Sequence, residues 1–98
     1  MTKRITRTDI RLTWVGDRGA LVARLPDAGM SVTLRMPNRW AKDATWALNF
    51  DMPTRRDYVT GGMLEGAKTD LQGMYLAEAA VTALARAILD AFEKKATP

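Results

Sequence analysis

Apolar and polar side chains alternate along residues 30–36, MSVTLRM, with a period of two. This period is typical of a half-buried β-strand, because successive side chains of a strand point to opposite faces. Shorter alternating segments over residues 9–15 and 45–51, and an apolar segment over 20–25, predict three more strands. Short turns that contain glycine or proline separate the first three strands, so we expect consecutive antiparallel hairpins.

Residues 38–48 allow two interpretations. Asn38 is a suitable N-cap for a helix that would carry Trp40 and Ala44 on one side. The alternation that places Trp46 and Leu48 on one face favours a loop followed by a strand. We expect the loop and the strand.

A loop over residues 52–68 is expected to lead into a long helix over residues 70–96. Thr69 and Gln72 have the spacing of a capping box, and the segment that follows is rich in alanine and leucine and free of proline. The apolar arc of this helix covers about 200° of its circumference, twice what packing on one surface requires. Its centre is formed by Ala77, Val81, Leu84, Ile88 and Phe92, and the narrow polar arc by Tyr75, Glu78, Thr82, Arg86 and Glu93.

These elements predict an α+β fold, with an antiparallel meander sheet of about four strands followed by one long C-terminal helix packed on one sheet face. Residues 9–98 are expected to form a single domain, and residues 1–8 a flexible basic arm.

The predicted helix is longer than the predicted sheet. Twenty-seven residues span about 40 Å as a helix, whereas a strand of six residues spans about 20 Å. One explanation is a break near Gly73, and another is a helix sunk deep into its own curved sheet. We favour a third, a homodimer or partner contact. The helix face proposed for it combines a leucine with an alanine-rich ridge, formed by Leu76, Ala80, Ala83 and Ala87.

The residue types argue against an enzyme. The chain has no histidine and no cysteine, which are common general bases, nucleophiles and metal ligands. The segment from Gly66 to Thr69 ends in Lys-Thr like a phosphate loop, but Ala67 stands where such a loop needs glycine. The aspartates are scattered among turns without metal-loop spacing. We therefore expect no catalytic residues, no metal and no cofactor.

The net charge of +4 mildly favours an anionic partner. On the sheet face opposite the helix we expect cations and no acidic residue. Trp40 is expected either to anchor a partner or to fold back as a lid on the core. The residues proposed to contact a partner lie on this face and its rim; they are Arg11, Arg24, Arg35, Arg39, Trp40, Lys42, Arg55 and Arg56.

Three functions fit this pattern. The first is a small non-catalytic regulator or inhibitor that occludes a surface of a protein or protein–nucleic-acid complex, as phage accessory and anti-defence proteins do. The second is a module that binds single-stranded DNA or RNA through the basic sheet face. The third is a structural protomer of a larger assembly. We expect no membrane contact, because no apolar run approaches roughly 18 residues. We expect a cytoplasmic location, because no apolar segment of a secretory signal follows the basic N-terminus and the chain has no cysteine.

Overall fold

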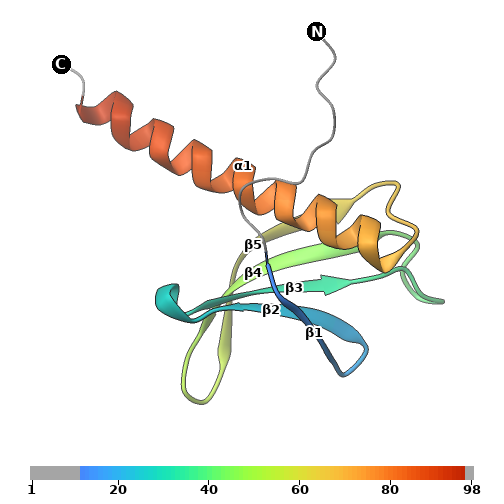
Figure 1. The fold of residues 1–98 in the computed structure, drawn as a ribbon. Coiled ribbons are helices and arrows are strands. Elements are labelled where there is room, and N and C mark those ends of the chain that lie inside the picture. The colour runs from blue at the N-terminus through green and yellow to red at the C-terminus, as the bar shows by residue number, and fades with distance from the viewer. Residues whose placement is uncertain (1–11, 97–98) are drawn as a thin grey trace, which may run out of the picture.

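The computed structural model of the chain describes residues 12–96 (Figure 1). In this part of the chain, five strands form one antiparallel sheet in the order β1-β2-β3-β4-β5, and one long helix follows. The expected α+β meander with a C-terminal helix is therefore confirmed. The elements are β1 (Trp14–Asp17), β2 (Ala20–Leu25), the short 3-10 helix η1 (Pro26–Ala28), β3 (Met30–Arg35), β4 (Ala44–Asp51), β5 (Arg56–Leu64) and α1 (Asp70–Ala96).

The loop expected over residues 52–68 is wrong, because most of it is the fifth strand. The segment that forms β5 contains Gly61 and Gly62 and lacks a clear alternation, so it carries no strand pattern of its own. Its strand conformation comes from pairing with β4, in a register that shifts between Leu48 and Asn49. The first strand spans Trp14–Asp17, whereas residues 9–15 were expected. The expected arm over 1–8 lies outside the described residues.

The turn between β1 and β2 has two residues, Arg18 and Gly19, because Asp17 pairs directly with Ala20. Both turn residues have positive φ, 52° and 82°. A two-residue turn with this conformation matches the right-handed twist of the strands that it joins. The hairpin is therefore tight, although Arg18 is not a residue that favours positive φ.

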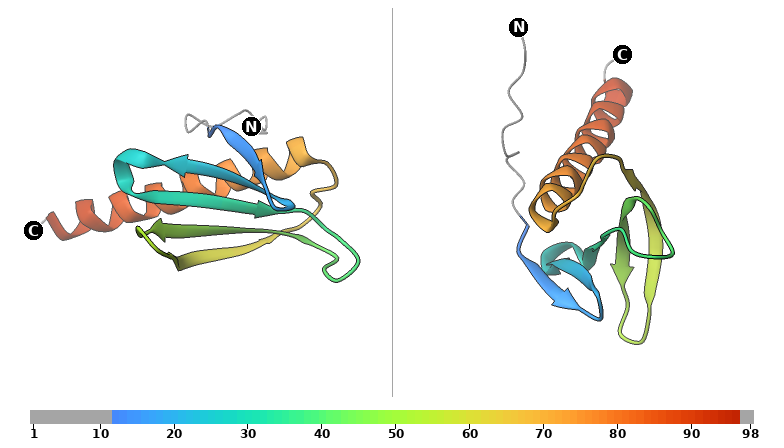
Figure 2. Two further views of the ribbon diagram at one scale, coloured as in Figure 1. Left: turned by 90° about the horizontal axis from the view of Figure 1, so that it is seen from below. Right: turned by 90° about the vertical axis from the view of Figure 1, so that its right-hand side faces the viewer.

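The core lies between α1 and one face of the sheet (Figures 1 and 2). Ala23, Val32 and Leu34 from β2 and β3 are fully buried, and Ala77 and Val81 from α1 pack against this layer. The alternation in the sequence therefore correctly predicts which side chains of β2 and β3 face the core.

The helix runs without interruption from Asp70 to Ala96, so a break near Gly73 is wrong. The capping box is confirmed, because the backbone N–H of Gln72 donates to Thr69 Oγ1 over 3.1 Å and the N–H of Thr69 donates to Gln72 Oε1 over 3.3 Å. Gly73 is buried against the side chains of Leu34 and Met36. Glycine at this position lets the first turns of α1 approach the sheet closely.

Glu78 was expected on the polar arc of the helix, but it is 1% exposed and faces β1. The backbone N–H of Leu12 and the indole N–H of Trp14 both donate to Glu78 Oε2, each over 3.2 Å. Two donors from the edge of the sheet thus end on one carboxyl oxygen of the helix. These bonds fix the edge strand to the N-terminal half of α1.

The C-terminal half of α1 extends beyond the sheet and leads away from it (Figures 1 and 2). Ile88 and Phe92, expected at the centre of the buried arc, are 49% and 68% exposed. The strands end before they can cover these residues, and Leu84 is the last residue of the helix that packs against the core clusters. The expected mismatch in length is therefore confirmed, and a helix sunk fully into its own sheet is wrong.

Two glycines give a matched pair of stability predictions. A Cβ at Gly61 would overlap the carbonyl oxygen of Trp46 on β4, so Gly61→Ala must displace backbone. We expect a loss of more than about 2 kcal/mol in the free energy of unfolding.

A Cβ at Gly73 would instead meet side chains only, the flexible Met36 Sδ at 2.7 Å and the Leu34 methyl groups at 3.2 and 3.3 Å. Against these contacts, alanine gains roughly 1 kcal/mol of helix propensity. We expect Gly73→Ala to stay within about 1 kcal/mol of the parent protein. Urea denaturation of both variants tests the pair, and equal losses would contradict it.

Candidate interaction surfaces

The sheet face opposite α1, called here the outer face, is set by the cross-strand register. Val22 pairs with Thr33, and Thr33 pairs with Ala47. The next cross-strand pairs on the same face join Arg24 to Ser31 and Ser31 to Asn49. The side chains expected on this face in β2, β3 and β4 therefore lie there.

Most of the centre of the outer face is buried, although α1 lies on the other side. Ser31, Thr33 and Asn49 are 0%, 9% and 6% exposed. The sheet is strongly curved, and the β1–β2 and β4–β5 hairpins turn away from the helix (Figure 2). Side chains of neighbouring strands therefore cover the centre of this face, and a large ligand would reach mainly its rim.

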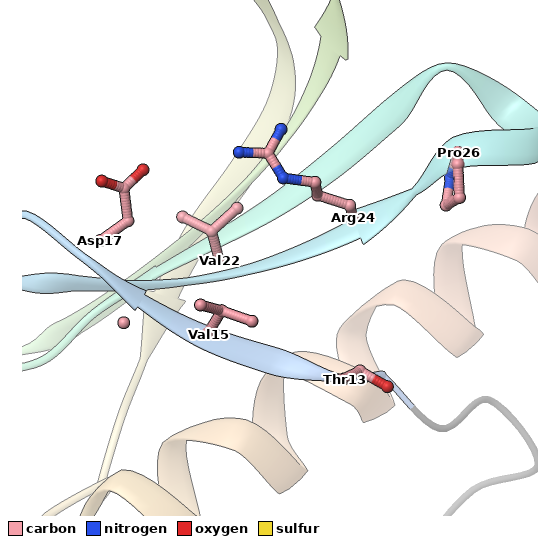
Figure 3. Close-up of a pocket in the computed structure, with 7 residues that line it drawn as sticks. Thr13, Val15, Asp17, Val22, Arg24 and Pro26 are labelled. Atoms are coloured by element: carbon pink, nitrogen blue, oxygen red, sulfur yellow. The ribbon is translucent and has the colours of Figure 1, made fainter.

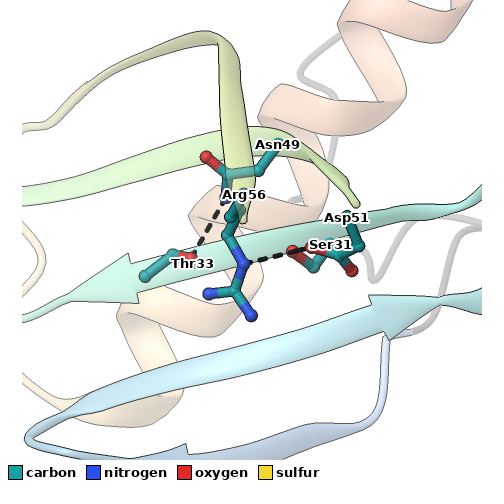
Figure 4. Close-up of polar contacts among 5 residues, drawn as sticks. All are labelled: Ser31, Thr33, Asn49, Asp51 and Arg56. Carbon is teal, nitrogen blue, oxygen red and sulfur yellow. Dashed lines mark hydrogen bonds and ion pairs between the residues drawn. The ribbon is translucent and has the colours of Figure 1, made fainter. Parts of the chain in front are cut away.

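The buried polar groups bond to one another (Figure 4). Asn49 Nδ2 donates to Thr33 Oγ1 over 3.2 Å, and Ser31 Oγ donates to Asp51 Oδ1 over 2.8 Å. Arg56 Nε donates to the same oxygen of Asp51 over 3.1 Å. These bonds join β3, β4 and β5, which gives this part of the outer face a structural role.

Asp51 corrects the expectation that no acidic residue lies on the outer face. Its carboxyl group reaches Ser31 on β3 and Arg56 on β5. The alternation that puts Ala47 and Asn49 of β4 on the outer face puts Asp51 there as well. The unrecognised strand β5 then places Arg56 opposite it.

The proposed cations separate into two groups at opposite ends of the strands. Arg35 ends β3 and adjoins the β3–β4 loop, which carries Arg39 and Lys42. Arg24 lies toward the opposite end with the β4–β5 hairpin, which carries Arg55 and Arg56. Arg11 lies outside the described residues.

The two hairpin arginines are engaged by acids. Arg55 Nε lies 3.0 Å from Asp57 Oδ1, and Arg56 Nε lies 3.1 Å from Asp51 Oδ1. Both pairs are at least partly open to solvent, so each contributes little to stability. They nevertheless neutralise the charge that the two arginines would offer to a phosphate backbone.

A depression of about 460 Å³ opens between β1 and β2 on the outer face (Figure 3). Val15 and Val22 lie close together at its centre, and Asp17 and Arg24 border it. One cation and one acid leave it without net charge. It is therefore an amphipathic surface feature and not an anion site.

Trp40 is 84% exposed, so the lid expected as one alternative is wrong. The loop that carries it is ordered by Asn38, whose Oδ1 accepts bonds from the backbone N–H groups of Trp40 and Ala41 over 2.8 Å and 2.9 Å. The Arg39 guanidinium lies 5.2 Å from the centroid of the Trp40 ring, within the range of a cation–π contact. Asn38 thus caps a turn and not a helix.

The β3–β4 loop lies beside the β5–α1 loop. Residues from both line a depression of about 330 Å³, in which Lys42 and Asp43 face Lys68 and Ala67. Lys68 was not expected beside the loop that carries Trp40, because only the unrecognised strand β5 brings residue 68 to this end of the sheet. We call the surface formed by Arg39, Trp40, Lys42 and Lys68 the Trp40 tip.

The helix face proposed for a partner is only partly accessible. Leu76 packs against the protein's own core and Ala80 is partly buried, whereas Ala83 and Ala87 are exposed. The large exposed apolar side chains of the projecting half are instead Ile88, Leu89 and Phe92, at 49%, 60% and 68%.

Within residues 12–96, no group of three or more acidic side chains is arranged to hold a metal ion. No helix in this part of the chain is long and apolar enough to cross a membrane. No protein-family model, curated protein or solved structure matches the chain.

The order of the Trp40 loop can be tested at Asn38. Asn38→Ala removes the acceptor of two backbone N–H bonds, so we expect larger nanosecond motion of the Trp40 backbone amide. Asn38→Asp keeps an acceptor and should leave the motion unchanged. Nitrogen-15 relaxation measures both, and an equally rigid Trp40 in the alanine variant would contradict the role of Asn38.

Proposed function

We propose that this chain is a small non-catalytic regulatory protein that binds another protein through the Trp40 tip and occludes the partner's surface. The observation that carries the proposal is Trp40 itself, 84% exposed on a loop that Asn38 holds in place. A tryptophan presented without its own core contacts is the kind of side chain that dominates protein interfaces. An ordered loop also reduces the conformational entropy lost on binding.

The surroundings of Trp40 suggest the chemistry of the partner. Arg39 lies over its ring, and Lys42 and Asp43 of the same loop line a depression together with Lys68. This mixture fits a partner with an apolar pocket bordered by acidic groups, because complementary charge speeds association and selects the partner. Phage accessory and anti-defence proteins act in this manner, and we expect a cytoplasmic site of action.

Single-stranded nucleic acid is the second candidate. The same tip offers an aromatic ring for stacking on a base, with cations beside it for phosphates. Against it stand the ion pairs of Arg55 and Arg56 and the presence of Asp51 on the outer face. These features break the continuous basic surface that a nucleic-acid strand would follow.

Trp40→Ala is the direct test. Partners are first identified from nuclease-treated lysate of the native host, and binding of the purified partner is then measured by calorimetry. Loss of an interface tryptophan should weaken binding by roughly 2–4 kcal/mol, a factor of about 30 to 1,000. The variant should fold normally, since the side chain makes few contacts with the core.

Tyr58→Ala serves as the matched control. Tyr58 is 68% exposed on β5 and pairs with Asn49, away from the Trp40 tip. It should leave binding to a protein unchanged, whereas a nucleic acid lying along the outer face would need it for stacking. Unchanged affinity of the Trp40 variant, or capture that nuclease abolishes, would overturn the proposed function.

A further inference from the structure

We propose that the projecting half of α1 is a self-association surface, on which a second copy of this chain packs antiparallel about a two-fold axis near Leu89. This inference is independent of the Trp40 tip. It rests on residues 85–93 of the helix, their exposure and the placement of their charges.

Four apolar side chains form one stripe on the projecting half of α1. At 100° per residue, Ala85, Ile88, Leu89 and Phe92 fall within about 100° of one another around the helix axis. Ala85 is partly buried, and the other three are about half exposed or more. A contiguous surface of two aliphatic side chains and one aromatic ring is a typical mark of an interface.

The contact stripe continues the core-facing side of the helix. Val81 and Leu84 lie one or two turns earlier on the same side, and both pack against the protein's own core. The apolar pattern thus runs on without change at the point where the sheet ends. Residues 85–96 extend the helix by about 18 Å, which is long enough for a short helix pair.

The stripe is complementary in shape to itself. The helices are antiparallel and the axis lies near Leu89. The Phe92 ring of each copy then fits into the space that the small Ala85 side chain leaves on the other copy, beside Ile88 and Leu89. A large ring then packs against the smallest side chain of the stripe, twice in the same interface. This repetition is what a two-fold symmetric contact requires.

The charges beside the stripe favour the same arrangement. Arg86 and Glu93 are both exposed and lie on one flank of the stripe, two turns apart. Antiparallel pairing places Arg86 of one copy next to Glu93 of the other at both ends of the contact. Parallel pairing would instead place both residues beside the opposite flank of the partner helix, where no Arg86–Glu93 pair forms.

The fold leaves room for this contact. The projecting half of α1 leads away from the sheet in both views (Figures 1 and 2), and packed helices cross at an angle of roughly 20–50°. The two sheets then lie at opposite ends of the dimer. The exposed alanines 83 and 87, favoured from the sequence, lie on the other side of the helix and stay in solvent.

Sedimentation equilibrium from micromolar to millimolar protein is the first test. We expect a monomer–dimer equilibrium for the parent chain and a monomer throughout for Phe92→Glu, which has no core contact to lose. Ala83→Glu is the control on the opposite side and should still dimerise. A strict monomer in the parent chain, or loss of the dimer only in Ala83→Glu, would overturn the proposal.

Charge exchange tests the antiparallel orientation. Arg86→Glu and Glu93→Arg should each weaken the dimer several-fold, and the double variant should recover it, because opposite charges again face each other. Failure of the double variant to recover would contradict antiparallel pairing.

Cross-linking locates the axis. The natural chain has no cysteine, so single-cysteine variants report one position each. Leu89→Cys lies near the axis, where two copies approach closely enough for a disulfide, and should cross-link on mild oxidation. Ala83→Cys lies at another exposed position and should not cross-link. The reverse result would place the contact on the alanine-rich ridge and overturn the proposed surface.

Discussion

The difference in length between helix and sheet determines how this molecule is built. The helix has 27 residues and is about 40 Å long, whereas the longest strand has nine residues and spans about 30 Å. A single-layer sheet can bury only the part of the helix that lies over it. The core therefore ends near Leu84, and the residues of α1 that follow are not covered by the sheet.

Within the part of the helix that does pack, one polar side chain sets the position of the sheet edge. Glu78 accepts bonds from the Leu12 backbone and from the Trp14 ring, and so ties the edge strand to the N-terminal half of α1. Trp14→Phe would remove the indole donor from this buried carboxyl oxygen, at a cost of about 1–3 kcal/mol. On the far side of the sheet, the bonds of Ser31, Asn49 and Asp51 hold three strands together. Polar contacts thus fix the sheet on both faces.

Local patterns were sufficient to predict the elements that have strong signals of their own. The helix over 70–96 follows from its capping box and composition, and the strand at Met30 follows from a clear alternation. The strand β5 was missed because its glycines give no strand signal in the sequence. Glycine at position 61 is required only because the Trp46 carbonyl lies so close to it, and that is a tertiary contact. Glu78 was misplaced for the same reason, since its donors are 64 and 66 residues away in the chain.

The candidate surfaces likewise combine features that local sequence predicts with features that depend on tertiary packing. Trp40 and its neighbouring cations could be chosen from residue types alone, but their exposure, and the arrival of Lys68 beside them, depend on the packing of two loops. The missed strand also pairs both hairpin arginines with acidic side chains. The helix contact moved from the alanine-rich ridge to the stripe around Leu89, because helical periodicity gives the apolar side but not the point where the sheet stops.

The central claim is that α1 consists of a half that forms the core and a half that forms a contact. Hydrogen–deuterium exchange along the helix, measured in dilute and in concentrated protein, tests this most directly. Amides of residues 74–84 should exchange slowly under both conditions, as those of a folded core do. Amides of residues 86–96 should exchange rapidly in dilute protein and become protected as the concentration rises. Equal and strong protection of both halves in dilute protein would contradict the account.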